Sequence, residues 1–119
     1  MKLTLKEQER LTIFGVAEIA RRRWKRGVKL NYIEATAIIC DELLERARSG
    51  GDSLADLISL GSKIISKEDV MEGSENLIPM IQLEVMLPDG NKLLTVHEPI
   101  RLEKQSDAIS KEQLLSLDY

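Results

Sequence analysis

The sequence predicts an α+β domain, with an antiparallel layer of three to four helices followed by one β-hairpin. In the first half of the chain, segments that begin with a cap-and-acid signal repeat apolar residues at the helical period. From Met80 to His97, apolar and polar residues alternate on both sides of the turn sequence PDGN. This change of period separates a helical part from a hairpin.

The first helix is predicted to run from a capping box at Thr4 and Glu7 to about Arg26, with Gly27 ending it. At ~100° per residue, one apolar face consists of Ile13, Val16, Ala17, Ala20 and Trp24. Three further apolar residues, Leu11, Phe14 and Ile19, fall outside this face. A helix that is apolar on several sides is expected to be covered on several sides.

The second helix is predicted to begin at the cap Asn31, with Glu34 in the reciprocal position. Its main stripe is predicted to be Ile33, Ala37, Cys40, Leu44 and Ala47, widened by Ile38, Ile39 and Leu43. The short connection GVKL predicts that the first two helices pack as an antiparallel pair.

A shorter third helix is predicted between the cap Ser53 and a closing Gly61, and Ser66 with Asp69 predicts one or two further turns. The first strand of the hairpin is predicted to bury Ile81, Leu83, Val85 and Leu87. Because two strands alone are marginal, the hairpin is expected to lean on the helices or to join strands of another chain.

Two segments follow from this pattern, a folded domain over 1–100 and a C-terminal extension over 101–119. The extension is polar at first and then offers Ser110 with Gln113 as a weak capping box before a leucine-rich end at Leu114, Leu115 and Leu117. It is expected to be mobile or to dock on a partner chain.

Composition limits the classes of function. The 119 residues and 43% apolar content suit one folded domain, and the net charge of −3 disfavours a nucleic-acid-binding protein, which is usually basic. No apolar run approaches the ~20 residues of a membrane span, and no signal peptide is recognisable, so a cytoplasmic location is expected. The single cysteine, Cys40, is expected to be a buried hydrophobe.

Candidates for catalysis are few. His97 is the only histidine and has no acid or nucleophile signature beside it, so a structural or interface role is favoured. HEPIR begins like a zinc-protease motif, but Arg101 stands where the second histidine is needed. The acidic pairs Asp41–Glu42 and Glu68–Asp69 are expected to be solvated helix surface. We therefore predict no catalytic, cofactor-binding or metal-binding residue on this chain.

The stretch ARRRWKRG places five basic residues at the end of the first helix, Arg21, Arg22, Arg23, Lys25 and Arg26. Cations there oppose the negative end of the helix dipole, and Glu18 can pair with Arg22. The five are expected to spread over the side away from Trp24. Contacts with a partner protein are favoured over nucleic acid, because arginine pairs with carboxylates bidentately.

Several stretches together resemble the gamma subunit of microbial urease. They are MKLT at the start, RRRWKRGVKLNYIEA (21–35), DVMEG (69–73) and LPDGNKLLTVHEPI (87–100). The likeness covers about residues 1–100 in one register. Gamma chains of this family usually end near VHEPI, whereas this chain continues for 19 residues.

The resemblance implies a non-catalytic subunit that joins a beta chain and a large alpha chain, with three such units around a threefold axis. It places the active site on the alpha chain, where two nickel ions bridged by a carbamylated lysine act in the hydrolysis of urea to ammonia and carbamate. No cofactor is expected on this chain. The predicted subunit-interface residues are Phe14, Arg22, Arg26, Tyr32 and His97.

Two alternatives stay open at this stage. One is a small basic-helix nucleic-acid-binding or regulatory protein, which would bind polynucleotides in a salt-dependent way. The other is a free-standing hydrolase that uses His97. Under the favoured hypothesis, the chain binds neither nucleic acid nor a membrane.

Overall fold

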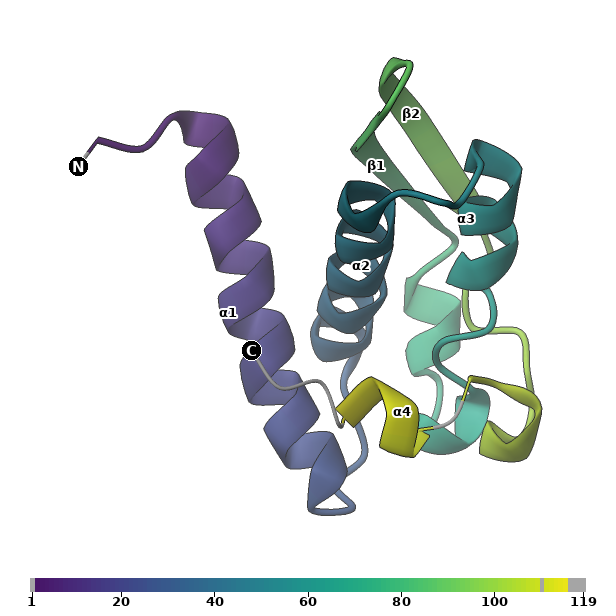
Figure 1. Cartoon of the computed structure of the whole chain (residues 1–119). Coiled ribbons are helices and arrows are strands. Elements are labelled where there is room, and N and C mark those ends of the chain that lie inside the picture. The colour runs from purple at the N-terminus through teal and green to yellow at the C-terminus, as the bar shows by residue number, and fades with distance from the viewer. Residues whose placement is uncertain (1, 110, 116–119) are drawn as a thin grey trace.

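The computed structural model describes residues 2–109 and 111–115 and has the predicted α+β architecture (Figure 1). Its elements in chain order are α1 (Leu5–Lys25), α2 (Tyr32–Ser49), α3 (Leu54–Gly61), η1 (Lys67–Asp69), η2 (Ser74–Leu77), β1 (Met80–Leu87), β2 (Gly90–His97), η3 (Gln105–Asp107) and α4 (Lys111–Leu115). Helix α2 lies between α1 on one side and the hairpin and α3 on the other.

The helix starts follow the capping signals of the sequence. Thr4 Oγ1 accepts from the Glu7 amide at 3.2 Å, and the Glu7 carboxylate accepts from the Thr4 amide at 2.9 Å. The same reciprocal pair joins Asn31 and Glu34 at the start of α2. Each box satisfies amide groups that a helix start would otherwise leave without partners.

The end of α1 is a Schellman motif, which turns the chain sharply into α2. Gly27 has φ of +83°, its amide donates to the Trp24 carbonyl, and the Val28 amide donates to the Arg23 carbonyl. The predicted stop at Gly27 is confirmed, since the left-handed conformation favours glycine.

Helix α2 forms the centre of the core, and Ala37, Cys40 and Ala47 of the predicted main stripe are buried. Its completely buried apolar side chains are Ala35, Ile38, Ile39 and Leu43. Ile33, placed in the main stripe by the sequence pattern, is 53% exposed. The prediction was wrong there because α2 is covered from two sides, which shifts its buried surface away from a single stripe.

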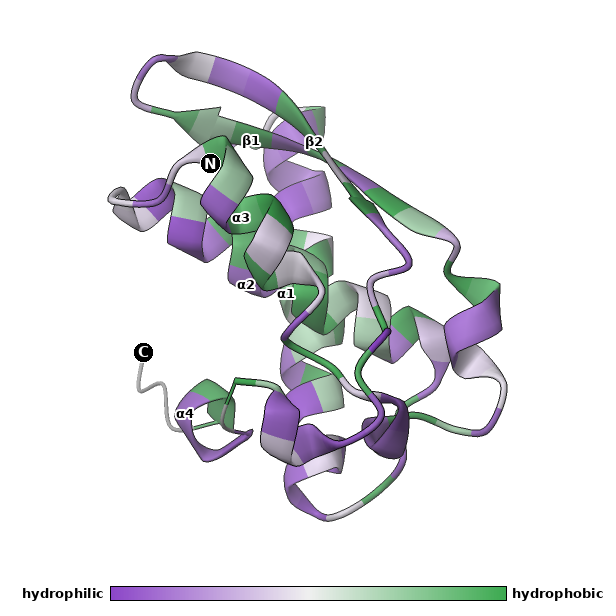
Figure 2. Cartoon of the chain, turned by 90° about the vertical axis from the view of Figure 1, so that its right-hand side faces the viewer, coloured by the Kyte–Doolittle hydropathy of each residue, from purple (hydrophilic) through white to green (hydrophobic). Residues whose placement is uncertain are grey.

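The hairpin packs on α2 and α3, as Figure 2 shows from the side. Strands β1 and β2 are antiparallel, with Leu83 opposite Leu94 and Leu87 opposite Gly90 across a two-residue loop. The residues that they bury against the helices are Ile81, Val85, Leu87, Leu94 and Val96. The marginal stability of two strands is thus offset by burial against helices of the same chain.

Gly61 is the last residue of α3, as predicted, and it also has a role in packing. It lies within α3 and does not have a positive φ, so it does not close the helix as a left-handed residue. A Cβ atom at this position would lie 2.7 Å from Val96 Cγ2 and 3.4 Å from Leu43 Cδ1. Glycine is required here because α3 approaches β2 closely.

The described part of the C-terminal extension packs against its own chain. The Lys67 amide donates to the Leu102 carbonyl at 2.8 Å, and the Ile109 amide donates to the Lys63 carbonyl at 2.8 Å. Leu114 of α4 is 5% exposed and joins the core. Ser110 and Leu117, which belong to the predicted cap and leucine-rich end, lie outside the described residues.

Candidate subunit interface

The five basic residues at the end of α1 do not share one surface. Arg21 is only 6% exposed and points into the α1–α2 contact. Its Nη2 lies 2.5 Å from Asp41 Oδ2 and 2.9 Å from Glu42 Oε1. The expectation that all five spread over the exposed side was therefore wrong for Arg21, which holds two helices of the same chain together.

Two other arginines of α1 extend this contact along α2. Arg10 pairs with Asp41 at 2.7 Å and with Glu45 at 2.5 Å, and Arg23 pairs with Glu34 at 2.7 Å. With Arg21 they form a ladder of ion pairs, here called the α1–α2 ionic ladder. Buried charges are tolerated in such a place because each has an oppositely charged, hydrogen-bonded partner.

The acidic pairs also differ from expectation. Asp41 has no exposed surface and Glu42 is 7% exposed, so neither is a solvated helix residue. Asp69 is buried as well and accepts from Trp24 Nε1 at 3.1 Å and from the Ser66 amide at 2.9 Å, whereas Glu68 is exposed as predicted. Asp41 and Glu42 are buried because Arg21 pairs with both, whereas Asp69 is buried because Trp24 and Ser66 donate hydrogen bonds to it.

A sequence signal for the ionic ladder exists, although our prediction missed it. Glu34, Asp41 and Glu45 are spaced by seven and four residues, which puts them on one side of α2. Arg21 follows Ala17 by four residues and precedes Trp24 by three, so it borders the apolar face of α1. Opposite charges on the facing sides of two antiparallel helices indicate intramolecular pairing.

Burial changes the acid–base behaviour of two groups on α2. Desolvation raises the pKa of Glu42 above its ordinary value, although the Arg21 guanidinium acts in the opposite direction. Desolvation, helped by the neighbouring Asp41, raises the pKa of the Cys40 thiol to about 11. Cys40 is thus a buried, neutral thiol, as predicted.

The opposite side of α1 is exposed and partly apolar. Helical geometry puts Leu11, Gly15, Ile19, Arg22 and Arg26 on one side, and we call these residues the outer face of α1. Leu11 is 58% and Ile19 is 53% exposed, and a Cβ atom on Gly15 would meet no atom within 4 Å. Exposed apolar groups beside cations are typical of a surface that another protein covers.

The five predicted interface residues lie on three elements. Arg22 and Arg26 are exposed on the outer face of α1, where Arg22 pairs with Glu18 at 3.4 Å, and Phe14 is half-buried on the flank of that helix. Tyr32 is 43% exposed at the start of α2, and His97 is exposed at the end of β2. Only Arg22 and Arg26 are brought onto one face.

A second exposed apolar group lies on the side of the hairpin that faces away from the helices. It consists of Met80, Met86 and Leu93, which are between 46% and 65% exposed. His97 is opposite Met80 in the strand register and so belongs to the same side. These three residues were not predicted as an interface, since an alternating strand always has one outward side.

The turn that follows His97 is held by a side chain from further along the chain. The Arg101 side chain donates to the His97 carbonyl at 2.6 Å and to the Glu98 carbonyl at 3.0 Å, which fixes the turn after β2. Within residues 2–109 and 111–115, no three His, Cys, Asp or Glu side chains come together as metal ligands.

No helix in the described part of the chain combines the length and the apolar character needed to cross a bilayer.

Two of the stretches that carry the resemblance to urease gamma chains meet in space. Leu30 pairs with Val70 as an isolated parallel bridge, and Trp24 is hydrogen-bonded to Asp69, so the segment 21–35 is tied to DVMEG. Residues 1–100 match the family model described as urease, gamma subunit. The chain therefore belongs to the urease gamma-subunit family and is a component of a urease, a hydrolase built from several subunits.

Proposed function

We propose that this chain is a non-catalytic structural subunit of urease, which joins a beta chain and a large alpha chain in a trimer of alpha-beta-gamma units. The family supports a place in a urease complex. The outer face of α1 carries the proposal, because it offers exposed apolar and cationic side chains that nothing in this chain covers among the described residues.

The catalytic centre is proposed to lie on the alpha chain. Two nickel ions there would supply the Lewis acidity and the activated water for the hydrolysis of urea to ammonia and carbamate. Three features of this chain are consistent with that division of roles. His97 is exposed, the Cys40 thiol is buried and neutral, and the carboxylates of the ionic ladder are engaged by arginines. A cytoplasmic location is part of the proposal.

The alternative of a nucleic-acid-binding protein loses support from the ionic ladder. Arg21 and Arg23 neutralise carboxylates of α2 and are not available as phosphate contacts. Arg22, Lys25 and Arg26 are exposed, and Arg22 is paired with Glu18. Binding of the chain to DNA or RNA that falls steeply with salt would favour the alternative.

Assembly is the function to test. We expect the double variant Arg22→Glu/Arg26→Glu, co-expressed with the alpha and beta chains, to co-purify with the alpha chain in reduced yield. The matched control is Arg48→Glu/Lys92→Glu, which changes the charge equally at exposed or half-buried positions remote from the outer face of α1. The intact mass of the complex and its nickel content are measured together.

An undiminished complex with the double variant, on size exclusion at raised salt, would argue against this interface. Urease activity of the chain alone, lost in His97→Ala, would overturn the non-catalytic role. The chain alone should show no urease activity, and activity should appear only on reconstitution with the alpha and beta chains.

A further inference from the structure

The C-terminal extension, outside the residues that match the family, covers a defined surface of its own chain. We call residues 101–109 and 111–115 the C-terminal strap. It begins where Arg101 holds the carbonyls of His97 and Glu98, directly after the left-handed Glu98 at φ of +44°. This turn sends the chain away from β2 and back toward the helices (Figure 1).

Polar contacts then fix the middle of the strap to residues 63–68. The Lys67 amide donates to Leu102, the Ile109 amide donates to Lys63, and the Gln105 amide donates to Glu68 Oε1 at 2.8 Å. Gln105 Nε2 also donates to the Ile109 carbonyl at 3.0 Å, within the strap itself. The strap therefore has a single, hydrogen-bonded path over the surface.

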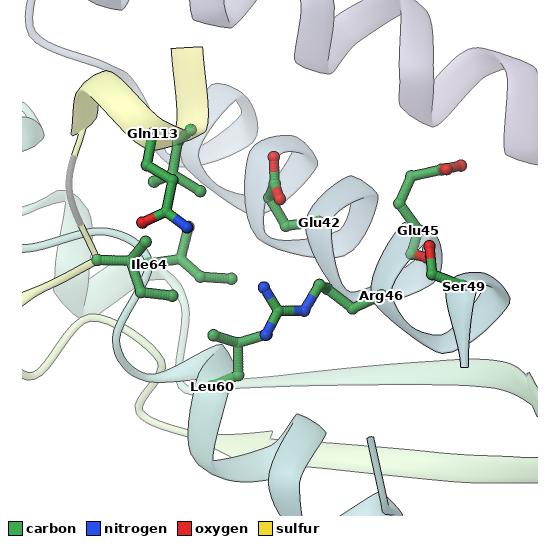
Figure 3. A pocket seen from close by; sticks show the side chains of 9 residues that line it. Glu42, Glu45, Arg46, Ser49, Leu60, Ile64 and Gln113 are labelled. Atoms are coloured by element: carbon green, nitrogen blue, oxygen red, sulfur yellow. The ribbon is translucent and has the colours of Figure 1, made fainter. Parts of the chain in front are cut away.

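The end of the strap closes over α2 and Trp24. Leu114 is buried, and the Lys111 ammonium lies 5.2 Å from the centroid of the Trp24 ring. A hollow of about 200 Å³ remains beside α4, and Figure 3 shows Gln113 around it with Glu42, Arg46, Leu60 and Ile64. The strap thus lies next to Glu42, one of the carboxylates that hold Arg21.

We propose that the C-terminal strap is a releasable cover: it docks on its own chain, shields Trp24 and the Glu42 side of the ionic ladder, and opens as a unit while residues 1–100 stay folded. Its helices have three and five residues and cannot persist without docking. Apart from Leu114, the buried apolar residues of the core all lie between Ala17 and Ile100. Local opening is expected where few anchors hold a short segment.

The test uses the full-length chain and Leu114→Ala, with Leu77→Ala as the matched control because Leu77 is 60% exposed in η2. Hydrogen exchange is followed at the Lys67 and Ile109 amides, whose hydrogen bonds join the strap to residues 63–68. It is also followed at Ile39 in the core. In Leu114→Ala we expect exchange at Lys67 and Ile109 to become about tenfold faster, with Ile39 unchanged.

Fluorescence gives an independent reading, since Trp24 is the only tryptophan. We expect quenching of Trp24 by acrylamide to rise about twofold in Leu114→Ala and to stay unchanged in Leu77→Ala. A second, milder variant, Lys111→Met, removes the ammonium from above the ring and is expected to shift the Trp24 emission without faster exchange at Ile39.

Unchanged exchange and quenching in Leu114→Ala would overturn the proposal. An equal rise at Lys67, Ile109 and Ile39 would also overturn it, because the strap would then open only with the whole domain. A dimer whose strap protection falls on dilution would show docking on a second copy instead. The test requires no partner chain, so its outcome is independent of the proposed role in urease assembly.

Discussion

At the scale of single residues, the contrast between Arg21 and Arg22 is the most informative. They are neighbours in the sequence, yet Arg21 is buried between two carboxylates, while the Arg22 side chain is 74% exposed and pairs with Glu18. A buried charge that loses its partner keeps its desolvation penalty, whereas an exposed ion pair contributes little. Adjacent arginines should therefore respond very differently to the same substitution.

We expect Arg21→Met to lower the free energy of unfolding by about 3–5 kcal/mol, because it removes the cation that pairs with the buried Glu42 and leaves the buried Asp41 with Arg10 alone. Arg22→Met should change it by less than about 0.5 kcal/mol. Urea unfolding of both variants at neutral pH measures the difference. Equal effects of the two substitutions would show that Arg21 is not the centre of the ladder.

Glycines allow a second comparison between matched residues. Gly61→Ala should destabilise the chain by about 1–3 kcal/mol, since the new methyl group would meet Val96 at 2.7 Å. Gly15→Ala should stabilise it by about 0.5–1 kcal/mol, because Gly15 is helical and faces open space. Thermal unfolding of both variants tests this.

The double variant Gly61→Ala/Val96→Ala examines the stated cause. Its loss of stability should be smaller than the sum of the two single losses, because removing the Val96 methyl groups makes room for the alanine. Simple additivity would mean that Gly61 is required for some reason other than the approach of α3 to β2.

At the scale of elements, α1 is held to α2 by charge as well as by apolar packing. Ala17, Ala20 and Trp24 are buried in this contact, and the ionic ladder runs beside them. Because the carboxylates are on α2 and the cations are on α1, the strength of the helix pair depends on pH. Glu42 provides the clearest prediction, since its pKa is raised by burial.

The direction follows from linkage. The folded pKa of Glu42 is above its ordinary value of 4.5, so the folded chain binds this proton more tightly than the unfolded chain does. The contribution of Glu42 to the free energy of unfolding is greatest below pH 4.5 and is lost as the pH rises through the pKa of Glu42 in the folded chain. Relative to wild type, Glu42→Gln should therefore gain stability as the pH rises through that window. Urea unfolding at several pH values checks this, and a difference that does not vary with pH would contradict it.

Cys40 reports on the burial of α2 as a whole. With its pKa raised from 9.0 to about 11, the native thiol should carry about a hundredfold less thiolate than an ordinary one below pH 9. We expect the native chain to react with a disulfide reagent at least about a hundred times more slowly than the urea-unfolded chain. The reaction is followed by the absorbance of the thiol that the reagent releases. Because Cys40 is the only cysteine, the whole signal comes from this residue. Similar rates in the two states would place Cys40 at an accessible surface.

At the scale of the whole molecule, one side of α1 packs against the core and the opposite side is exposed. The core lies between α1, α2, α3 and the hairpin, and the outer face of α1 is turned away from it. An interface residue should therefore affect assembly but not folding. Ile19, which is 53% exposed on that face, allows this separation to be tested.

We expect Ile19→Glu to leave the free energy of unfolding of the chain within about 0.5 kcal/mol of wild type, as for other exposed positions. Co-purification with the urease alpha chain should nevertheless fall, because a charge would enter an apolar contact. Leu93→Glu on the outward side of the hairpin is the comparison for the second apolar group. If Ile19→Glu assembles normally and Leu93→Glu does not, the interface lies on the hairpin.

The sequence by itself determined the elements of this protein and its family. The capping boxes at Thr4 and Asn31, the stop at Gly27 and the alternation in Met80–Leu87 depend on local backbone geometry, which neighbouring residues specify. The same is true of the stretches 21–35, 69–73 and 87–100, which carry the resemblance to urease gamma chains.

Only the tertiary structure decided which charged groups are buried, why Gly61 is glycine and where the extension lies. Arg21, Asp41 and Asp69 have partners 20 or more residues away, and the strap rests on residues 63–68. These contacts depend on how segments that are distant in the sequence face each other in the fold. A one-dimensional pattern records which side of a helix is apolar, but a charge is buried only where the partner that compensates its desolvation is brought to it through space.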